Sequence, residues 1–205
     1  MNDVERALSE IADIHAQLAA STRFRGIAPE ANVLTGLLVL LVAVAQTIWP
    51  EALAQNAFRY VSVWAAATAA STIIVAVEAI SRARRLHGRM ADAMLGTILR
   101  QLLPFLAAGV IITAVICRFA TGNLWMLPGL WEILIGLFGF SVMLSVPRAL
   151  AWVAAWYLFC GSVVLVLAGW GGTLSPWMMG FPLAAGQMAV ALILHRADGV
   201  RDGQA

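Results

Sequence analysis

A single acidic residue, Glu132, lies in the middle of the apolar run LPGLWEILIGLFGF, residues 127–140. A charged carboxylate at the centre of a bilayer costs about 3 kcal/mol or more, so an acid in such a run is a functional candidate. If the helix begins at Pro128, however, Glu132 lies about one turn from the surface, where free N–H groups stabilise a carboxylate. Two interpretations stay open: a surface anchor beside Trp131 that pairs with Arg118, or a ligand or proton site.

A second polar feature, Pro182 with Gln187, lies in the last apolar stretch. Proline frees a carbonyl and kinks a helix, and Gln187 falls about 15 Å along the helix from Trp177, near mid-membrane. Broken helices with mid-membrane polar groups bind substrates in transporters, although prolines and single glutamines also serve as packing devices in inert bundles. We therefore treat Pro182, Gln187 and Trp177 as candidate site residues.

Most tryptophans fall near the same ends of the apolar stretches as Trp177. They are Trp49, Trp64, Trp125, Trp131 and Trp170. Such a distribution is typical of an interfacial aromatic belt, because indole places its ring among lipid tails and its N–H among headgroups. The alternative is an aromatic-lined pocket for a cation or a flat hydrophobic ligand.

Membrane-spanning helices are the elements that must position these residues. Of the 205 residues, 61% are hydrophobic and only 12% are charged, which is too apolar for a soluble domain. Six stretches of about 20 residues can cross a bilayer. They are 32–49, 60–80, 101–117, 129–146, 149–169 and 177–194. We expect an all-α membrane protein, a six-transmembrane-helix bundle over 30–195, with cytoplasmic segments at 1–25 and 196–205.

Small residues indicate where helices approach one another closely. The fourth stretch contains Gly129, Gly136 and Gly139, and the second contains the alanine-rich run 65–71. Small side chains allow backbone contact between membrane helices. These two spans are therefore expected at the centre of the bundle, with self-association as the competing use of the same surfaces.

The arginines predict the orientation. All 13 basic residues are arginine, and only Arg59 and Arg118 fall on one side of the expected membrane, against eleven on the other. Because positively charged loops stay in the cytoplasm during insertion, both termini are expected inside. This pattern predicts a multipass membrane protein with six crossings, surrounded by the lipid bilayer.

The N-terminal segment has the spacing of an amphipathic helix. Its apolar face consists of Val4, Leu8, Ile11, His15 and Leu18. Its charges are mainly acidic, so anionic lipid should repel it and its apolar face should pack on protein. The segment Arg82–Arg100 is also helical in pattern, and either lies along the inner membrane surface or extends the neighbouring spans. These elements favour a homo-oligomer or a cytosolic protein partner.

Motifs for catalysis and cofactor binding are missing from the sequence. The histidines, His15, His87 and His195, all fall outside the expected spans, so no pair within the bilayer can ligate a haem. Metal-ligand spacing, a Walker loop, a GxSxG elbow and an HExxH helix are absent. The arginines form no basic stripe for nucleic acid. We expect no enzyme, no cofactor and no nucleic-acid binding.

The segment His15–Trp49, with the pattern TxFRGxxP at Thr22–Pro29, resembles a group of small uncharacterised bacterial inner-membrane proteins. The resemblance covers about the first quarter of the chain and implies the same six-helix fold and location. It transfers no activity. The sequence as a whole favours a non-enzymatic regulatory or interaction protein. The alternative is a small-solute permease or ligand-binding membrane sensor that uses the intramembrane polar residues.

Overall fold

The computed structural model describes residues 28–87, 91–143, 146–171 and 174–202, and these residues are predominantly helical. The elements are α2 (Pro29–Ile48), α3 (Pro50–Leu53), α4 (Ala57–His87), α5 (Ala91–Phe119), the 3-10 helix η2 (Thr121–Met126), α6 (Leu127–Ser141), α7 (Leu150–Gly171) and α8 (Trp177–Asp202). The expected N-terminal interaction face lies outside the described residues. Its members are Val4, Leu8, Ile11, His15 and Leu18.

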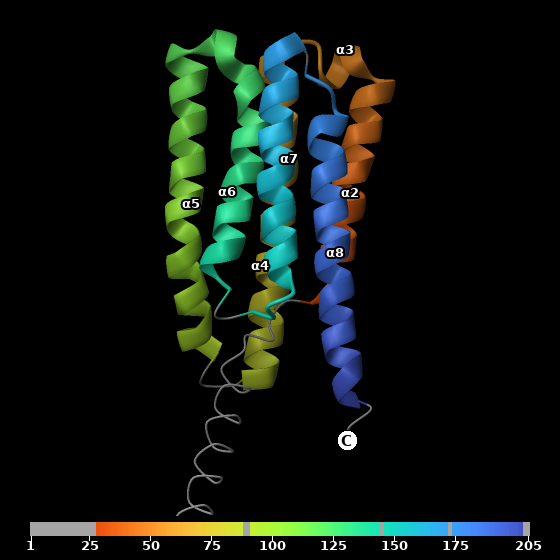
Figure 1. Ribbon diagram of the computed structural model, residues 1–205, viewed down its shortest axis with the longest axis vertical. Helices are drawn as coiled ribbons and strands as arrows, with labels where there is room; N and C mark the ends of the chain where they lie inside the picture. The colour runs from red at the N-terminus through yellow and green to blue at the C-terminus, as the bar shows by residue number, and fades with distance from the viewer. Residues whose placement is uncertain (1–27, 88–90, 144–145, 172–173, 203–205) are drawn as a thin grey trace, which may run out of the picture.

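Six helices of the described chain are long and apolar enough to cross a membrane, as the sequence predicts. They run alternately up and down in Figure 1, so the start of α2 and the end of α8 lie at the same end of the bundle. We call this the lower end, and the end that carries α3 and η2 the upper end. The fourth span covers Thr121–Ser141 instead of 129–146, because η2 continues directly into α6.

Prolines shape the helices in two ways. Pro29, Pro50 and Pro128 lie in the first turns of α2, α3 and α6, where a missing N–H leaves no helical hydrogen bond unmade. Pro104 and Pro182 lie inside α5 and α8. There, each leaves the carbonyl four residues earlier without its helical donor. Both helices therefore have a point at which bending costs less.

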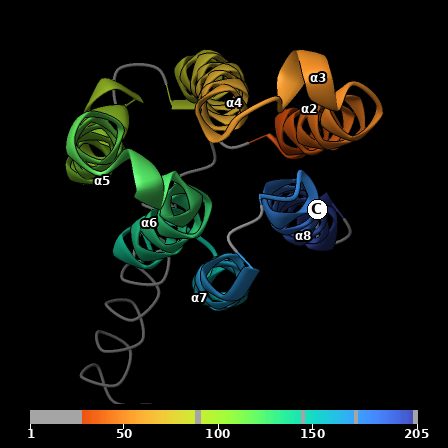
Figure 2. The ribbon, with the colours of Figure 1, turned by 90° about the horizontal axis from the view of Figure 1, so that it is seen from above.

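The six spanning helices form a ring when seen from above (Figure 2). Neighbours in the ring are neighbours in the chain, and α8 closes the ring against α2. The closest pairs are α6 with α7 and α2 with α8. By contrast, only 6% of the apolar window of α5 is buried, against 44% for α8. The interior is thus built mainly by the other helices, and α5 lies at the periphery.

Glycines bring α6 and α7 into backbone contact. A Cβ atom on Gly129 would lie 2.6 Å from the carbonyl oxygen of Gly161, and one on Gly161 would lie 2.7 Å from that of Gly129. A Cβ on Gly136 would lie 2.8 Å from the carbonyl oxygen of Ala154. Small residues allow this close approach, which increases the van der Waals contact between the two helices. Such contact is important in a membrane, because lipid removes the hydrophobic driving force for helix association. The pair fixes the position of Glu132 between Gly129 and Gly136.

The alanine-rich face of α4 does not lie at the centre, contrary to the prediction. Ala65, Ala66 and Ala69 are exposed, whereas Tyr60 and Trp64 are buried, with relative exposures of 1% and 0%. The interior of the ring accommodates large aromatic side chains, and two aromatic rings bury far more surface than alanines do. Burying them turns Ala65, Ala66 and Ala69 outward, while Ala67 and Ser71 of the same run stay buried.

The segment Arg82–Arg100 extends the neighbouring spans, because α4 continues to His87 and α5 begins at Ala91. At this lower end, Arg82 lies 3.9 Å from Glu30 of α2 in a partly exposed ion pair. Such pairs contribute at most about 1 kcal/mol to stability. The pair places the start of α2 beside the end of α4.

Candidate functional site

Glu132 lies in the interior of the ring with no exposed surface. It falls eleven residues after Thr121 and nine before Ser141, so it is close to the midpoint of its span. It is the sixth residue of α6, beyond the four free N–H groups of a helix start. Neither carboxyl oxygen has a hydrogen-bond partner among the described residues. The helix N-terminus therefore does not stabilise this carboxyl directly.

Arg118, the counter-ion considered from the sequence, is exposed. Its guanidinium lies over the ring of Phe119, 5.6 Å from the ring centroid. Because no described residue donates a hydrogen bond to the Glu132 carboxyl, Arg118 does not form the expected pair with it. Glu132 is thus a mid-span acid that has no paired cation among the described residues.

Three buried side chains from two other helices lie within electrostatic reach of the Glu132 carboxyl. They are Tyr60 of α4 and Tyr157 and Cys160 of α7. The chain has only two tyrosines, and both of them are in this group. A phenol can donate a hydrogen bond to a carboxylate and can accept one from a protonated carboxyl. We call Glu132, Tyr60, Tyr157 and Cys160 the central cluster.

Hydrogen bonds to α8 and to the segment before it hold both phenols. The Tyr60 hydroxyl donates to the carbonyl oxygen of Ser175 at 2.9 Å. The Tyr157 hydroxyl donates to that of Leu183 at 3.4 Å, which is long for an O–H donor. The neighbouring Trp156 indole donates to the Pro182 carbonyl oxygen at 3.1 Å. Pro182 is therefore part of the contact between α7 and α8. Of the three hydrogen bonds, the long one from the Tyr157 hydroxyl is the weakest and the easiest to replace by a bond to another acceptor.

Trp64 lies one helical turn below Tyr60, with the two ring centroids 6.3 Å apart. It is fully buried, so it does not belong to an interfacial belt as the sequence suggested. A Cβ on Gly180 would lie 3.7 Å from the Trp64 ring and 2.5 Å from the Cβ of Ala43. Glycine at this position of α8 therefore allows α8 to approach α2 at Ala43, while the Trp64 ring lies at an ordinary contact distance.

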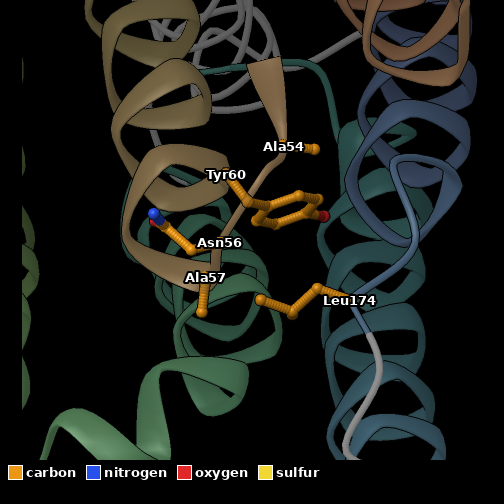
Figure 3. A pocket seen from close by; sticks show the side chains of 5 residues that line it. All are labelled: Ala54, Asn56, Ala57, Tyr60 and Leu174. Carbon is orange, nitrogen blue, oxygen red and sulfur yellow. The ribbon is translucent and has the colours of Figure 1, made fainter. Parts of the chain in front are cut away.

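A shallow, open cavity of about 180 Å³ lies at the upper end, lined by Ala54, Asn56, Ala57, Tyr60 and Leu174 (Figure 3). It is smaller than the pockets of about 300–1,000 Å³ that hold drug-sized ligands, so it suits a small solute or a few water molecules. The side chain of Tyr60 thus belongs both to the lining of the upper cavity and to the central cluster.

Several residues predicted from the sequence face elsewhere. The Cβ of Gln187 lies 3.3 Å from a Cβ built on Gly36, so Gln187 faces α2. The Trp131 indole donates to the Thr113 hydroxyl at 3.0 Å and so faces α5. Trp177 is 44% exposed. The structure therefore brings Pro182 to the central cluster through α7, but not Gln187, Trp131 or Trp177.

The sequence-based candidates did not include Tyr60 and Tyr157. A signal is present for Tyr157, because it falls inside the expected span 149–169, whereas Tyr60 is the first residue of the expected span 60–80 and falls near a span end, as most tryptophans do. A polar hydroxyl in the membrane interior needs a partner, so a rare tyrosine there is informative. Which helix would supply the partner is not encoded in that pattern.

Comparison with protein-family models, curated proteins and solved structures gives no match for this chain. The resemblance of residues 15–49 to small bacterial inner-membrane proteins stays a prediction. Within the described part of the chain, no three His, Cys, Asp or Glu side chains gather in a way that could hold a metal ion. The functional argument therefore depends on the geometry of the central cluster.

Proposed function

We propose that this protein is a small-solute permease in which Glu132 is the central binding residue. One observation carries the proposal: a carboxyl at the middle of a membrane span is fully buried and has no hydrogen-bond partner among the described residues. An acid in this position destabilises the fold, so its presence favours a role in binding. A small cationic solute or a proton is the chemistry that a carboxylate beside aromatic rings attracts.

The arrangement of the helices supports alternating access. The closely packed pairs α6–α7 and α2–α8 meet near the central cluster, where Trp156 and Tyr157 donate hydrogen bonds to the consecutive carbonyls of Pro182 and Leu183 in α8. Transporters commonly move one rigid group of helices against another around a mid-membrane site with a broken helix. In this proposal, α8 bends at Pro182 and opens the cluster to one side at a time.

We further propose that the lower end faces the cytoplasm of a bacterial cell. The described arginines support this orientation, because those at the lower end outnumber Arg59 and Arg118 at the upper end. The lower group comprises Arg82, Arg84, Arg85, Arg100, Arg148 and Arg196. Positively charged segments remain on the cytoplasmic side during insertion. The cavity beside Tyr60 would then open to the outside.

The test is uptake by the purified full-length protein in liposomes. Methylammonium, tetramethylammonium and guanidinium serve as probes, and Glu132→Gln is compared with Glu51→Gln, which alters an exposed acid on α3. We expect uptake of at least one probe, its loss in Glu132→Gln and its retention in Glu51→Gln. Equal uptake by Glu132→Gln and the wild type would refute the proposal. A probe-induced thermal shift without uptake would assign a sensor instead of a permease.

A regulatory role through the N-terminal segment stays a separate prediction, because that segment lies outside the described residues. Its test is a crosslinking assay with residues 2–20 deleted. Loss of self-association or of partner association would support the role, and unchanged association would count against it.

A further inference from the structure

Glu132 and Tyr157 lie at the same depth on the closely packed pair α6–α7. A Cβ on Gly129 of α6 would meet the carbonyl oxygen of Gly161 on α7, so these two glycines face each other. The two helices run in opposite directions (Figure 1). Three residues forward from Gly129 therefore correspond to three residues back from Gly161. This register places Glu132 level with residue 158, which directly follows Tyr157.

The two side chains also lie on the same side of this pair. Gly129 and Gly136 of α6 face α7, and Ala154 of α7 faces α6. Glu132 and Tyr157 each follow one of these facing residues by three positions, which turns each of them by about 60° from the contact line of its helix. In an antiparallel pair, equal offsets of this kind fall on one side. That side is the interior of the ring, because Glu132 is 0% and Tyr157 is 5% exposed.

The phenol of Tyr157 fills the space between α7 and α8 at this depth. Its hydroxyl donates to the carbonyl oxygen of Leu183 at 3.4 Å. A Cβ built on Gly186 would fall on the phenol, at its Oη, Cζ and Cε2 atoms. Glycine at this position of α8 therefore allows the ring to reach the backbone of α8. The phenol thus closes the interior beside Glu132 from α7 across to α8, its neighbour in the ring (Figure 2).

The phenol should keep its place beside Glu132 when α8 moves. Glycines join α6 and α7 backbone to backbone, so the acid and the phenol belong to one closely packed unit. The hydrogen bond from Tyr157 to α8 is long and therefore weak. In the proposed opening movement, α8 bends at Pro182 and moves away from α7, whereas Tyr157 stays with α6 and α7. The phenol therefore limits the space beside the carboxyl both before and after opening.

The two oxygens of Glu132 indicate what a bound cation must offer. Neither of them has a hydrogen-bond partner among the described residues. A planar cation with paired N–H donors satisfies both oxygens of a carboxylate at once, as guanidinium does. Alkyl groups on such a cation would need additional room. A close-fitting pocket distinguishes ligands that differ by one methylene group by about tenfold or more.

We propose that Tyr157 is the specificity-determining residue of this site, and that it restricts the cation at Glu132 to small N–H donors of the guanidinium or primary ammonium class. This inference rests on the proposed permease function and names its substrate class. The carboxylate of Glu132 supplies the charge and accepts the hydrogen bonds. The ring of Tyr157 excludes cations whose nitrogen atoms carry bulky alkyl groups.

The test compares uptake of guanidinium with uptake of tetramethylguanidinium by the full-length protein in liposomes. Both cations stay charged and both keep N–H donors, so they differ mainly in size. Tyr157→Ala and Tyr157→Val remove the ring, whereas Tyr157→Phe keeps it. Phe138→Ala is the control for loss of a ring elsewhere on α6, because Phe138 packs against Phe105 of α5 with the ring centroids 5.9 Å apart.

We expect the wild type to take up guanidinium at least about tenfold faster than tetramethylguanidinium, because the added methyl groups do not fit beside the phenol. Tyr157→Ala and Tyr157→Val should lower this ratio by at least about threefold, since the space that the ring leaves accommodates methyl groups. Tyr157→Phe and Phe138→Ala should keep the wild-type ratio. Uptake of guanidinium by each variant shows that the variant is folded.

A wild-type ratio in the variants without the ring would overturn the inference, and so would loss of the ratio in Tyr157→Phe. Equal uptake of the two cations by the wild type would overturn it as well, without any variant having to fold. The permease function fails separately, through guanidinium uptake that is absent or that is unchanged in Glu132→Gln. Uptake that depends on Glu132 but has a ratio independent of Tyr157 would refute the inference alone.

Discussion

Tyr60 donates its phenolic hydroxyl to the carbonyl oxygen of Ser175 at 2.9 Å, across 115 residues of sequence. This bond joins the first turn of α4 to the segment that precedes α8, and so it closes the upper end of the bundle. The same phenol lines the upper cavity and lies within electrostatic reach of Glu132. Tyr60 therefore holds the upper end of the bundle closed and also lies in the cluster around the buried acid Glu132.

Tyr60→Phe should open the upper end. The change removes one hydrogen bond worth about 1 kcal/mol, so open forms should become about fivefold more populated. The measurement is the rate at which maleimide labels the buried Cys160 in a Cys117→Ser background, since these are the two free cysteines. Labelling should accelerate about fivefold. Ser62→Ala, an exposed change on α4, is the control, and a Tyr60→Phe rate equal to that of the control would contradict this role.

Gly161→Ala should destabilise the α6–α7 pair. The added methyl group would meet the Gly129 carbonyl oxygen at 2.7 Å, and overpacking of this kind costs about 1–3 kcal/mol. Gly96→Ala in α5 is the matched control, because a Cβ there has no neighbour within 4 Å. The control should be neutral or more stable by up to about 1 kcal/mol through helix propensity. Unfolding of the purified protein in denaturing detergent measures both, and equal stabilities would show that α6 and α7 do not pack as described.

Trp131→Phe should reduce stability without affecting uptake. The change removes the 3.0 Å hydrogen bond from the indole to Thr113, worth about 1 kcal/mol, between α6 and α5. Trp131 neighbours Glu132 in sequence, so it was a candidate for the same site. Thermal unfolding and liposome uptake of the same preparation separate the two roles. Loss of uptake with unchanged stability would place Trp131 in the functional site after all.

The fold was largely predictable because hydropathy and proline positions carry the necessary information. Runs of about 20 apolar residues mark the spans, and Pro29 and Pro128 fall in first turns of helices. The start of the fourth span was less predictable. Residues 121–126 contain Gly122 and Asn123, which are typical of a turn, yet they form η2 and extend the span.

The central cluster was only partly predictable, because hydropathy does not encode rotation about the helix axis. Consecutive residues differ by about 100°, so Glu132 faces the interior while Trp131 faces α5. Helix α7 is apolar on all sides, and no pattern in its sequence shows that Tyr157 faces the centre. Gln187 lies near the expected depth, but its Cβ contacts α2. The depth of a residue in the membrane follows from its distance along the sequence from the end of the span. Which side chains meet at one site depends instead on how the helices pack against one another.

The most direct test of the central claim is the unfolding free energy of Glu132→Met relative to the wild type. If Glu132 is kept for binding at the expense of stability, an apolar side chain of similar size should stabilise the bundle by about 1–3 kcal/mol, the cost of a buried polar group without a partner. Glu51→Met at an exposed site should change little. A loss of stability in Glu132→Met would contradict the claim, because it would show that the carboxyl supports the fold.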